Sequence, residues 1–574
     1  MEFWTQLWLK EGVARFMEFV GIKTIFPEWE AWTEFVQSVY GLALNLDAMT
    51  SSHPVEVEVL RPEQIKEIYN AISYAKGASI VRMIISLIGL DKFLKGMNVY
   101  MNRHSFSNTT TPMLWEAFQE VSYIPVVDLM SPWTANVGYP VVILPDPEKG
   151  DPMIIRSPRF LVMGPSPTDE GDKTWPIPVT ALVEGVANVQ GPWIINSPIG
   201  DDMGALVRRV QQWTDKGLWF KLNVSQTGFY RVVYTDKQRQ RLRNVMSSAG
   251  PLPAVDRLGL LSDIFATGRA GYTPVVDALR VAVKFAEEEE AEYAVWQELC
   301  DNLRVLDDLY RSESFYPNFQ KMILHIYKKQ MGILGWEEDP RESPRTATLR
   351  SLVIRMLGIA GDQNVIEECY RRFQIYMDNP DEVEMSGDLR QVIFRNSLRR
   401  DEEHVYNTLK MHYERSTFPE EERNCLTAMS CVRDMERHKD MLNYVLFSGQ
   451  VRDQDIAFPL NSLVTSSDEA GRACWNMMKN DFDKLEAEFG GGPIWGTIVG
   501  LMCRGLKTLE EADEVEAFFR DPKHSPSSGR MRLSQALEVV RVKATRLERN
   551  KEALSEFLLS EFPLTSQEIA CEDD

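Results

Sequence analysis

The sequence predicts a mainly α-helical protein that carries one small β-sandwich. Apolar residues recur at helical spacing from residue 1 to about 137, short β-branched runs follow over 138–235, and helical spacing returns over 236–574. A chain of 574 residues is also too long for one hydrophobic core. We therefore predict three domains with these boundaries.

The first region opens on MEFWTQLWLKEGVARFMEFVG, a predicted helix with two apolar stripes. Trp4 and Trp8 belong to one stripe, and Glu11 continues it. Burying an unpaired carboxylate is costly, so we expect Glu11 either to reach solvent at a cleft or to have a cationic partner.

The clearest helix in the first region is predicted between Pro62 and Gly89. The apolar residues of this stretch follow a helical period throughout. Proline suits the first turn of a helix and glycine the position after its end, which supports both limits.

The middle region consists of short apolar runs separated by Pro, Gly and Asp. The runs are YPVVILPDPEKG, DPMIIRSPRFLVMG, TWPIPVTALVEG, GPWIINSP and LWFKLNVSQTGFYRVVY. Runs with this spacing predict an antiparallel sandwich of roughly 100 residues. The acidic stretch PSPTDEGDK, at 165–173, is expected to be a solvated hairpin loop.

The last region is helical to its end. Segments of about 12 to 18 residues alternate with breaks such as AGPLPAVDR, GWEEDPRESPR, MDNPDEVEMSGD and FGGGPIWG. This rhythm is similar to that of paired-helix solenoids, although no consensus repeats. We expect a large α-helical, HEAT-like superhelical domain.

Composition excludes several classes of function. The chain has 63 basic and 84 acidic residues and a net charge of −21, which disfavours binding to nucleic acid and to anionic membrane surfaces. No apolar run reaches the ~18 residues of a membrane span. The seven cysteines form no C-x-x-C pair and are interpreted as reduced thiols, which favours a cytoplasmic location.

Several short strings occur in a distinctive order along the chain. They include WLKEGVA from Trp8, SSHPVEV from Ser51, NAISYAKGASIVRM from Asn70, WPIPV from Trp175, GFYRVVY from Gly228 and DRLGLLSDIF from Asp256. In this order and spacing they resemble the zinc aminopeptidases of the gluzincin clan, of the alanyl or puromycin-sensitive type. That family has W-L-N-E-G-F-A at the place of WLKEGVA and D-x-I-x-Y-x-K-G at the place of NAISYAKGASIVRM.

The resemblance implies a zinc-dependent aminopeptidase that releases N-terminal amino acids from peptides. Glu11 falls on the third zinc ligand, beside two histidines of an H-E-x-x-H helix, and Tyr74 falls on the tyrosine that stabilises the transition state. A phenol in that place donates a hydrogen bond to the oxyanion that forms when water attacks the peptide carbonyl. The region 1–137 would then be the helical C-terminal portion of a thermolysin-like catalytic domain.

The sequence also departs from the family pattern. His53 is the first of its seven histidines, and none of them opens an H-E-x-x-H string. The G-x-M-E-N string, which holds the substrate's amine in the family, is also absent, so no substrate-binding residue is assigned. His53 is expected to form a structural hydrogen bond, and one glutamate alone binds zinc too weakly to matter. Lys10 replaces an asparagine and would compete with Zn²⁺ electrostatically. We therefore expect a chain truncated ahead of Met1 that is inactive alone.

Three functions stay open at this point. The first is the C-terminal part of a zinc aminopeptidase whose catalytic start is absent from the sequence. The second is a non-catalytic scaffold, derived from an aminopeptidase, that binds peptides or proteins on a concave helical surface. The third is complementation by a missing N-terminal segment that supplies the zinc helix as a separate chain.

Overall fold

The computed structural model describes residues 3–60, 62–165, 174–198, 200–247, 249–287, 290–526, 529–566 and 568. The predicted acidic loop therefore lies, apart from its first residue, outside the described residues. The chain divides into two compact units, which are Met1–Val281 with Glu288–Glu298, and Ala282–Glu287 with Leu299–Asp574. Each unit is described by itself.

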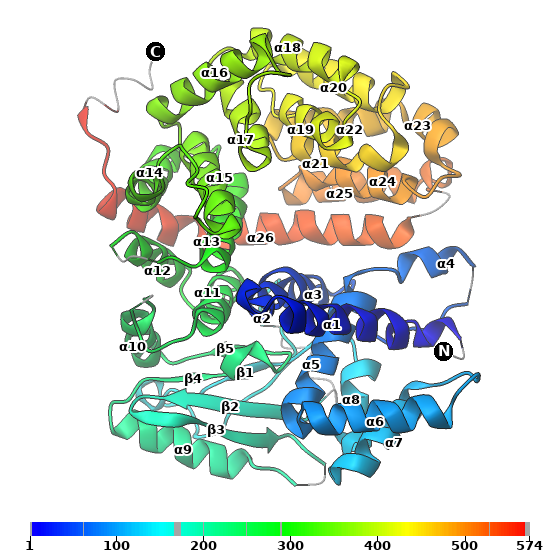
Figure 1. Cartoon of the computed structure of the whole chain (residues 1–574), viewed down its shortest axis with the longest axis vertical. Helices are drawn as coiled ribbons and strands as arrows, with labels where there is room; N and C mark the ends of the chain where they lie inside the picture. The colour runs from blue at the N-terminus through cyan, green and yellow to red at the C-terminus, as the bar shows by residue number, and fades with distance from the viewer. Residues whose placement is uncertain are drawn as a thin grey trace. The chain divides into compact units, whose positions relative to one another are not determined.

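The first unit begins with helices, as predicted (Figure 1). Two of them, η3 and η4, are π-helical turns. The bounds are η1 Trp4–Gln6, α1 Trp8–Ile25, η2 Pro27–Trp29, α2 Ala31–Glu34, η3 Phe35–Tyr40, α3 Gly41–Asp47, α4 Pro62–Glu67, η4 Ile72–Lys76, α5 Gly77–Ile88, α6 Leu90–Arg103, α7 Thr111–Ser122 and α8 Val126–Ala135.

The continuous helix predicted between Pro62 and Gly89 is wrong, because the chain turns after Glu67. At the turn, the Asn70 side chain accepts a hydrogen bond from the Ile72 backbone N–H at 2.8 Å and donates one to the Glu67 carbonyl at 2.8 Å. An asparagine that bonds the local backbone in this way competes with helical hydrogen bonding. The predicted end is confirmed, since Gly89 follows α5 with a φ of 85°.

Helix α1 crosses the start of α5 at two glycines. A Cβ added at Gly12 would lie 2.9 Å from the Gly77 backbone, and one added at Gly77 would lie 3.1 Å from the Gly12 Cα. Because no side chain separates the two backbones, the residues next to these glycines are brought close together. Trp8, fully buried one turn before Gly12, fixes α1 further by donating from its indole N–H to Thr111 Oγ1 at 3.0 Å.

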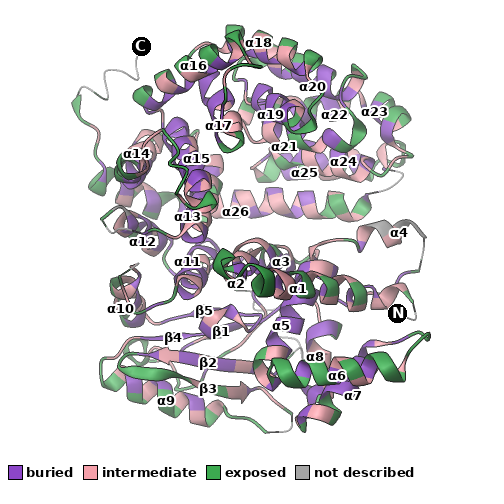
Figure 2. Cartoon of the chain, viewed as in Figure 1, coloured by how far each residue is buried: buried purple, intermediate pink, exposed green. Residues whose placement is uncertain are grey.

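Two small sheets follow the first helices. An antiparallel sheet has the order β3-β2-β4, and a second sheet pairs β1 with β5 in parallel. Figure 2 shows the outer strand β3 largely exposed, whereas β2 alternates buried and half-buried residues. The bounds are β1 Val141–Ile143, β2 Ile177–Val183, β3 Val186–Ile195, β4 Phe220–Leu222 and β5 Arg231–Val233.

The sheet region differs from the predicted antiparallel sandwich in three ways. The β1–β5 pair is parallel. The run DPMIIRSPRFLVMG forms only isolated bridges, at Arg156 and Arg159, because its prolines donate no backbone hydrogen bond to a ladder. Residues between β3 and β4 form the helix α9, Met203–Asp215, which packs on β3 and buries Leu206, Val210 and Trp213 at helical spacing.

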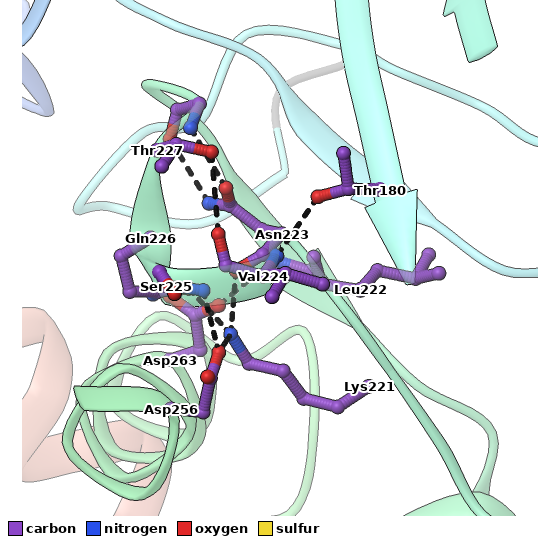
Figure 3. A network of polar contacts seen from close by, with 12 residues as sticks. Thr180, Lys221, Leu222, Asn223, Val224, Ser225, Gln226, Thr227, Asp256 and Asp263 are labelled. Carbon is purple, nitrogen blue, oxygen red and sulfur yellow. Dashed lines mark hydrogen bonds and ion pairs between the residues drawn. The ribbon is translucent and has the colours of Figure 1, made fainter. Parts of the chain in front are cut away.

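A buried polar network joins β4 and the turn after it to helix α11, Ala254–Arg269 (Figure 3). Lys221 Nζ lies 2.6 Å from Asp256 Oδ1 and donates to the Gln226 side chain at 2.8 Å. The same Asp256 oxygen accepts a hydrogen bond from the Ser225 backbone N–H at 2.7 Å. The side chains of Lys221 and Asp256 are 2% and 0% exposed. Each charge therefore needs the other to offset the free-energy cost of its burial.

From residue 236 the chain is helical, as predicted. Helices α10 Asp236–Val245 and α11 complete the first unit, and α12 Val276–Glu287 and α13 Tyr293–Tyr310 contribute residues to both units. The second unit then contains α14 Tyr316–Leu334, α15 Pro344–Ile359, α16 Gln363–Asp378, α17 Gly387–Ser397, α18 Glu402–Arg415, α19 Pro419–Met429, α20 Met435–Phe447, α21 Ala457–Val464, α22 Asp468–Asn480, α23 Phe482–Phe489, α24 Trp495–Arg504, α25 Leu509–Arg520 and α26 Arg530–Glu561.

Neighbouring helices of the second unit pack together, including α14 with α15, α16 with α17 and α18 with α19. The 32-residue helix α26 lies alongside α24 and α25 and reaches α14 (Figure 1). Breaks fall where they were predicted, after α14, α16 and α23. A large helical domain is therefore confirmed, while its HEAT-like superhelical form stays a prediction.

Six cysteines lie within the described residues, and all six are free thiols, as predicted. Five of them are buried in the helices of the chain. Across the described ranges, none of the helices combines the length and the apolar composition that crossing a lipid bilayer requires.

Lys221→Met should lower the free energy of unfolding by about 3–5 kcal/mol, because Asp256 would keep a buried charge without its partner. Urea unfolding followed by tryptophan fluorescence measures the change. Arg103→Ala, which removes an exposed ion pair with Glu120, is the control and should cost at most about 1 kcal/mol. Equal losses in the two variants would show that Lys221 has no special role.

Candidate functional site

A pocket of about 500 Å³ in the first unit contains both site residues that the sequence predicted. One wall is helix α1, which supplies Glu11, and the facing wall is the π-helical turn η4, which supplies Tyr74. The full lining is Glu11, Ala14, Arg15, Glu18, Ser38, Val39, Leu42, Tyr69, Asn70, Ala71, Tyr74 and Ala75.

The Glu11 carboxylate has two polar neighbours. Lys10 Nζ lies 3.1 Å from Glu11 Oε1, and the Tyr74 side chain lines the same pocket and feels the charge of Glu11. The Glu11 side chain is 18% exposed. Both expectations for this glutamate are therefore met, since it reaches a pocket and it also has a cationic partner.

Tyr74 stays protonated over the whole physiological range. Its pKa is raised to about 12, chiefly by desolvation and in addition by the neighbouring Glu11 carboxylate. The charge of Glu11 also acts on Lys10, whose pKa is raised chiefly by the hydrogen bond between the two side chains. The pocket thus presents a carboxylate and a neutral phenol that can donate a hydrogen bond, and the Lys10 ammonium lies beside the carboxylate.

Both π-helical turns of the first unit line the pocket, η3 through Ser38 and Val39 and η4 through Tyr74 and Ala75. A π-helical turn widens the helix locally and is often found at functional sites. The chain at η4 thus presents Tyr74 toward α1 while the neighbouring Ala75 remains buried.

A fully buried ion pair anchors the end of η4. Lys76 Nζ lies 2.8 Å from Asp47 Oδ2 and donates to the Gly138 carbonyl at 3.0 Å. The other Asp47 oxygen accepts hydrogen bonds from the Gly138 backbone at 3.0 Å and from Ser52 Oγ at 2.7 Å. Burial lowers the pKa of Lys76, and the charge of Asp47 opposes that shift. The pair connects α3, η4 and the start of the sheet region.

His53 has the structural role expected of it. It is 7% exposed, its Nε2 lies 2.7 Å from Asn70 Nδ2, and its Nδ1 lies 2.7 Å from the Pro54 carbonyl oxygen. Because the Asn70 amide donates, Nε2 accepts and Nδ1 carries the proton given to Pro54. Burial also lowers the pKa of His53. Both ring nitrogens are thus engaged within the protein.

The residues present fit only part of a catalytic zinc site. Such a site takes three protein ligands and keeps a fourth position open. Glu11 offers one carboxylate of the right type, but among the described residues no histidine lines the pocket. These residues alone therefore do not make a complete zinc site.

The sequence did not single out Tyr69, Asn70, Arg15 or Glu18 as pocket residues. The Tyr69 ring centroid lies 6.3 Å from that of Tyr74 and 5.8 Å from Lys10 Nζ. Tyr69 and Asn70 reach the pocket because the chain turns there. Asparagine favours turns, so Asn70 was the feature of the sequence from which this turn could have been predicted. Arg15 and Glu18 pair with each other at 2.6 Å and follow Glu11 on the same helix.

Family comparisons match most of the chain. Residues 1–133 match the model described as the Peptidase family M1 domain. Residues 219–542, which are more than half of the chain, match the model described as the ERAP1-like C-terminal domain.

The similar proteins found by sequence comparison are named aminopeptidases. Aminopeptidase M1 of Arabidopsis thaliana is 31% identical over 562 residues, which cover 96% of this chain and 62% of the relative. Aminopeptidase M1-C of Oryza sativa subsp. japonica is 30% identical, with coverage of 96% and 61%. The puromycin-sensitive aminopeptidase of Caenorhabditis elegans is 27% identical, with coverage of 97% and 58%. The chain spans about three fifths of the length of these relatives.

Glu11→Gln should lower the pKa of Tyr74 from about 12 toward its ordinary value, because removing the negative charge makes the phenolate less unfavourable. The measurement is the alkaline titration of tyrosinate absorbance, taken as the difference between each protein and the same protein with Tyr74→Phe. Glu18→Gln, in the same pocket but paired with Arg15, is the control and should leave the titration unchanged. An unchanged Tyr74 titration in Glu11→Gln would contradict the contribution of Glu11 to the pKa of Tyr74.

Proposed function

Because the chain belongs to the M1 family of zinc aminopeptidases, we propose that it is the part of such an enzyme that carries one zinc ligand, Glu11, and one transition-state donor, Tyr74. The observation that carries this proposal is that the two side chains line one pocket, where Glu11 contributes to the raised pKa of Tyr74. The two residues are 63 positions apart in the sequence and come from the two family strings noted above.

Glu11 is suited to hold a metal because helix α1 is fixed in place by buried Trp8 and by the close contact of Gly12 with Gly77. A rigid helix presents its carboxylate oxygen at a constant position, which a metal ligand requires. Zinc bound there with two histidines would supply an activated water for attack on a peptide carbonyl. The histidines and the general base belong to an H-E-x-x-H string, which the sequence does not contain.

Tyr74 would act on the substrate and not only on Glu11. Its raised pKa keeps the proton on the phenol, so that the hydroxyl can donate to a developing oxyanion. We propose this hydroxyl as the transition-state hydrogen-bond donor of the reaction.

The substrate proposed is a peptide with a free N-terminus, and the location proposed is the cytoplasm. Support comes from the names of the relatives, which are aminopeptidases, and from the free thiols of the described cysteines. We also keep the division into domains at 1–137, 138–235 and 236–574 as a proposal, supported by the change from helices to strands after α8 and back to helices at α10.

Tyr74→Phe should lower kcat roughly 10²–10³-fold without loss of zinc, since it removes one oxyanion donor but no ligand. Glu11→Ala should lose both zinc and activity. The protein is produced from its complete coding sequence and assayed for zinc content and for release of N-terminal residues from peptides. Tyr123→Phe, at a residue that is 90% exposed, is the control and should match the parent.

Two outcomes would count against this function. If Tyr74→Phe and Tyr123→Phe have the same kcat, Tyr74 is not the donor. If the product recognised by an antibody to the C-terminal residues SEFPLTSQEIACEDD has a mass of 65.8 kDa, binds no zinc and releases no amino acid, the aminopeptidase proposal fails for this product. Peptide binding by that product would instead favour the non-catalytic scaffold.

Lys10→Asn should strengthen zinc retention by the complete protein about three- to tenfold. The Lys10 ammonium, 3.1 Å from Glu11 Oε1, repels a dication at that oxygen with an energy on the order of 1 kcal/mol in a solvated site. The measurement is the chelator concentration that removes half of the zinc. Lys23→Asn, near the end of the same helix, is the control, and equal retention in the two variants would contradict the competition.

A further inference from the structure

The second unit contains a group of potential metal ligands far from Glu11 in the sequence. Among the described residues, one ligand atom each from His412, Glu421 and Cys425 lies within 4.8 Å of the others. We propose that these three side chains form an accessory site for a zinc-type cation, which joins helix α18 to helix α19. This site is independent of the proposed function at Glu11.

The local sequence explains why the three side chains meet. Glu421 and Cys425 are four residues apart on α19, so they project from the same face of that helix. His412 lies near the end of α18, which packs against α19. His412 Nε2 is 3.0 Å from Glu421 Oε1, so two of the three donor atoms already point at each other.

The set of donors matches the preference of zinc. Imidazole nitrogen, thiolate sulfur and carboxylate oxygen are its usual protein ligands, and three of them with one open position is a recurrent arrangement. Ligand atoms around tetrahedral zinc are roughly 3.5 Å apart, given bonds of about 2.0–2.3 Å. Because the three atoms lie within 4.8 Å of one another, movements of at most about 1 Å would bring them to these spacings.

Burial makes the three side chains a built site and not a chance surface group. Cys425 is fully buried, the Glu421 side chain is 6% exposed and the His412 side chain is 18% exposed. Within the described part of the chain, no hydrogen bond is made by Cys425 Sγ. The more open side, at His412, is where a water molecule could complete the coordination.

Neighbouring polar groups already orient the glutamate. Arg390 Nη1 lies 3.0 Å from Glu421 Oε2, and the Tyr376 hydroxyl donates to Oε1 at 3.1 Å. Arg390 thus holds Oε2, while Oε1, which Tyr376 and His412 contact, is the oxygen that would bind a cation in exchange for the contact with His412. Hydrogen bonds of this kind to a ligating carboxylate are typical supports of metal sites.

Binding changes the protonation of the site in a defined way. The Cys425 thiol must lose its proton to become a thiolate ligand, and burial raises the pKa of this thiol, so it is protonated before the cation arrives. His412 can bind through Nε2 as a neutral imidazole, whose single proton is then on Nδ1. Each bound dication should therefore release about one proton to the buffer.

The test uses Co²⁺, because a cobalt–thiolate bond has a near-ultraviolet charge-transfer band. The purified chain, kept reduced and stripped of metal with a chelator, is titrated with Co²⁺ alone. We expect one equivalent to bind with a thiolate band and with release of about one proton, which calorimetry in buffers of different ionisation enthalpy measures. Zn²⁺ should then abolish the band by displacing Co²⁺, since it binds such ligands more tightly.

Matched variants locate the site. Cys425→Ser should remove the band, and His412→Gln should weaken Co²⁺ binding at least tenfold. Cys431→Ser and His404→Gln, a nearby half-buried thiol and an exposed histidine on α18, are the controls and should leave both readouts unchanged. Circular dichroism of each variant shows that it is folded.

Several results would overturn the proposal. They are no Co²⁺ binding at micromolar concentrations, binding without a thiolate band, or a band that survives in Cys425→Ser. Metal bound at Glu11 cannot imitate the expected result, because no cysteine lines that pocket among the described residues.

Discussion

A buried ion pair, Lys76 with Asp47, lies where three parts of the first unit meet. Asp47 ends α3, Lys76 ends the π-helical turn that carries Tyr74, and both side chains bond to Gly138 at the start of the sheet region. A charge so deeply buried is tolerated only with its partner in place, so the three segments must assemble together. The position of Tyr74 is thereby tied to the sheet region and not to its own helix alone.

The opposite wall of the pocket depends on the absence of side chains. Gly12 and Gly77 let α1 lie directly against the start of α5, and this contact brings Glu11 and Tyr74 into the lining of one pocket. Alanine at either glycine would place a carbon about 3 Å from the facing backbone. Backbone packing thus explains why the strings WLKEGVA and NAISYAKGASIVRM contain these glycines. The same strings contain Glu11 and Tyr74, for which we propose roles in the reaction.

Sequence patterns were informative where periodicity or a local string decides the structure. The helical first and last regions, the free thiols, the role of His53 and the meeting of Glu11 with Tyr74 at one pocket all follow from them. They failed where side-chain hydrogen bonding overrides periodicity, as at Asn70, and where pairing joins distant segments, as in the parallel β1–β5 pair. The partner of Glu11 was its own neighbour Lys10, because a long lysine side chain can fold back although adjacent helical positions diverge.

The contact between Lys10 and Glu11 has a consequence for how the protein matures. In many small metal-binding domains the site does not exist before the chain folds, so the binding energy of the metal drives folding. Here the lysine acts as an internal counter-ion, and α1 can reach its final position with the carboxylate already neutralised. Under the proposed role of Glu11 as a metal ligand, folding of this helix would then not depend on binding of the metal.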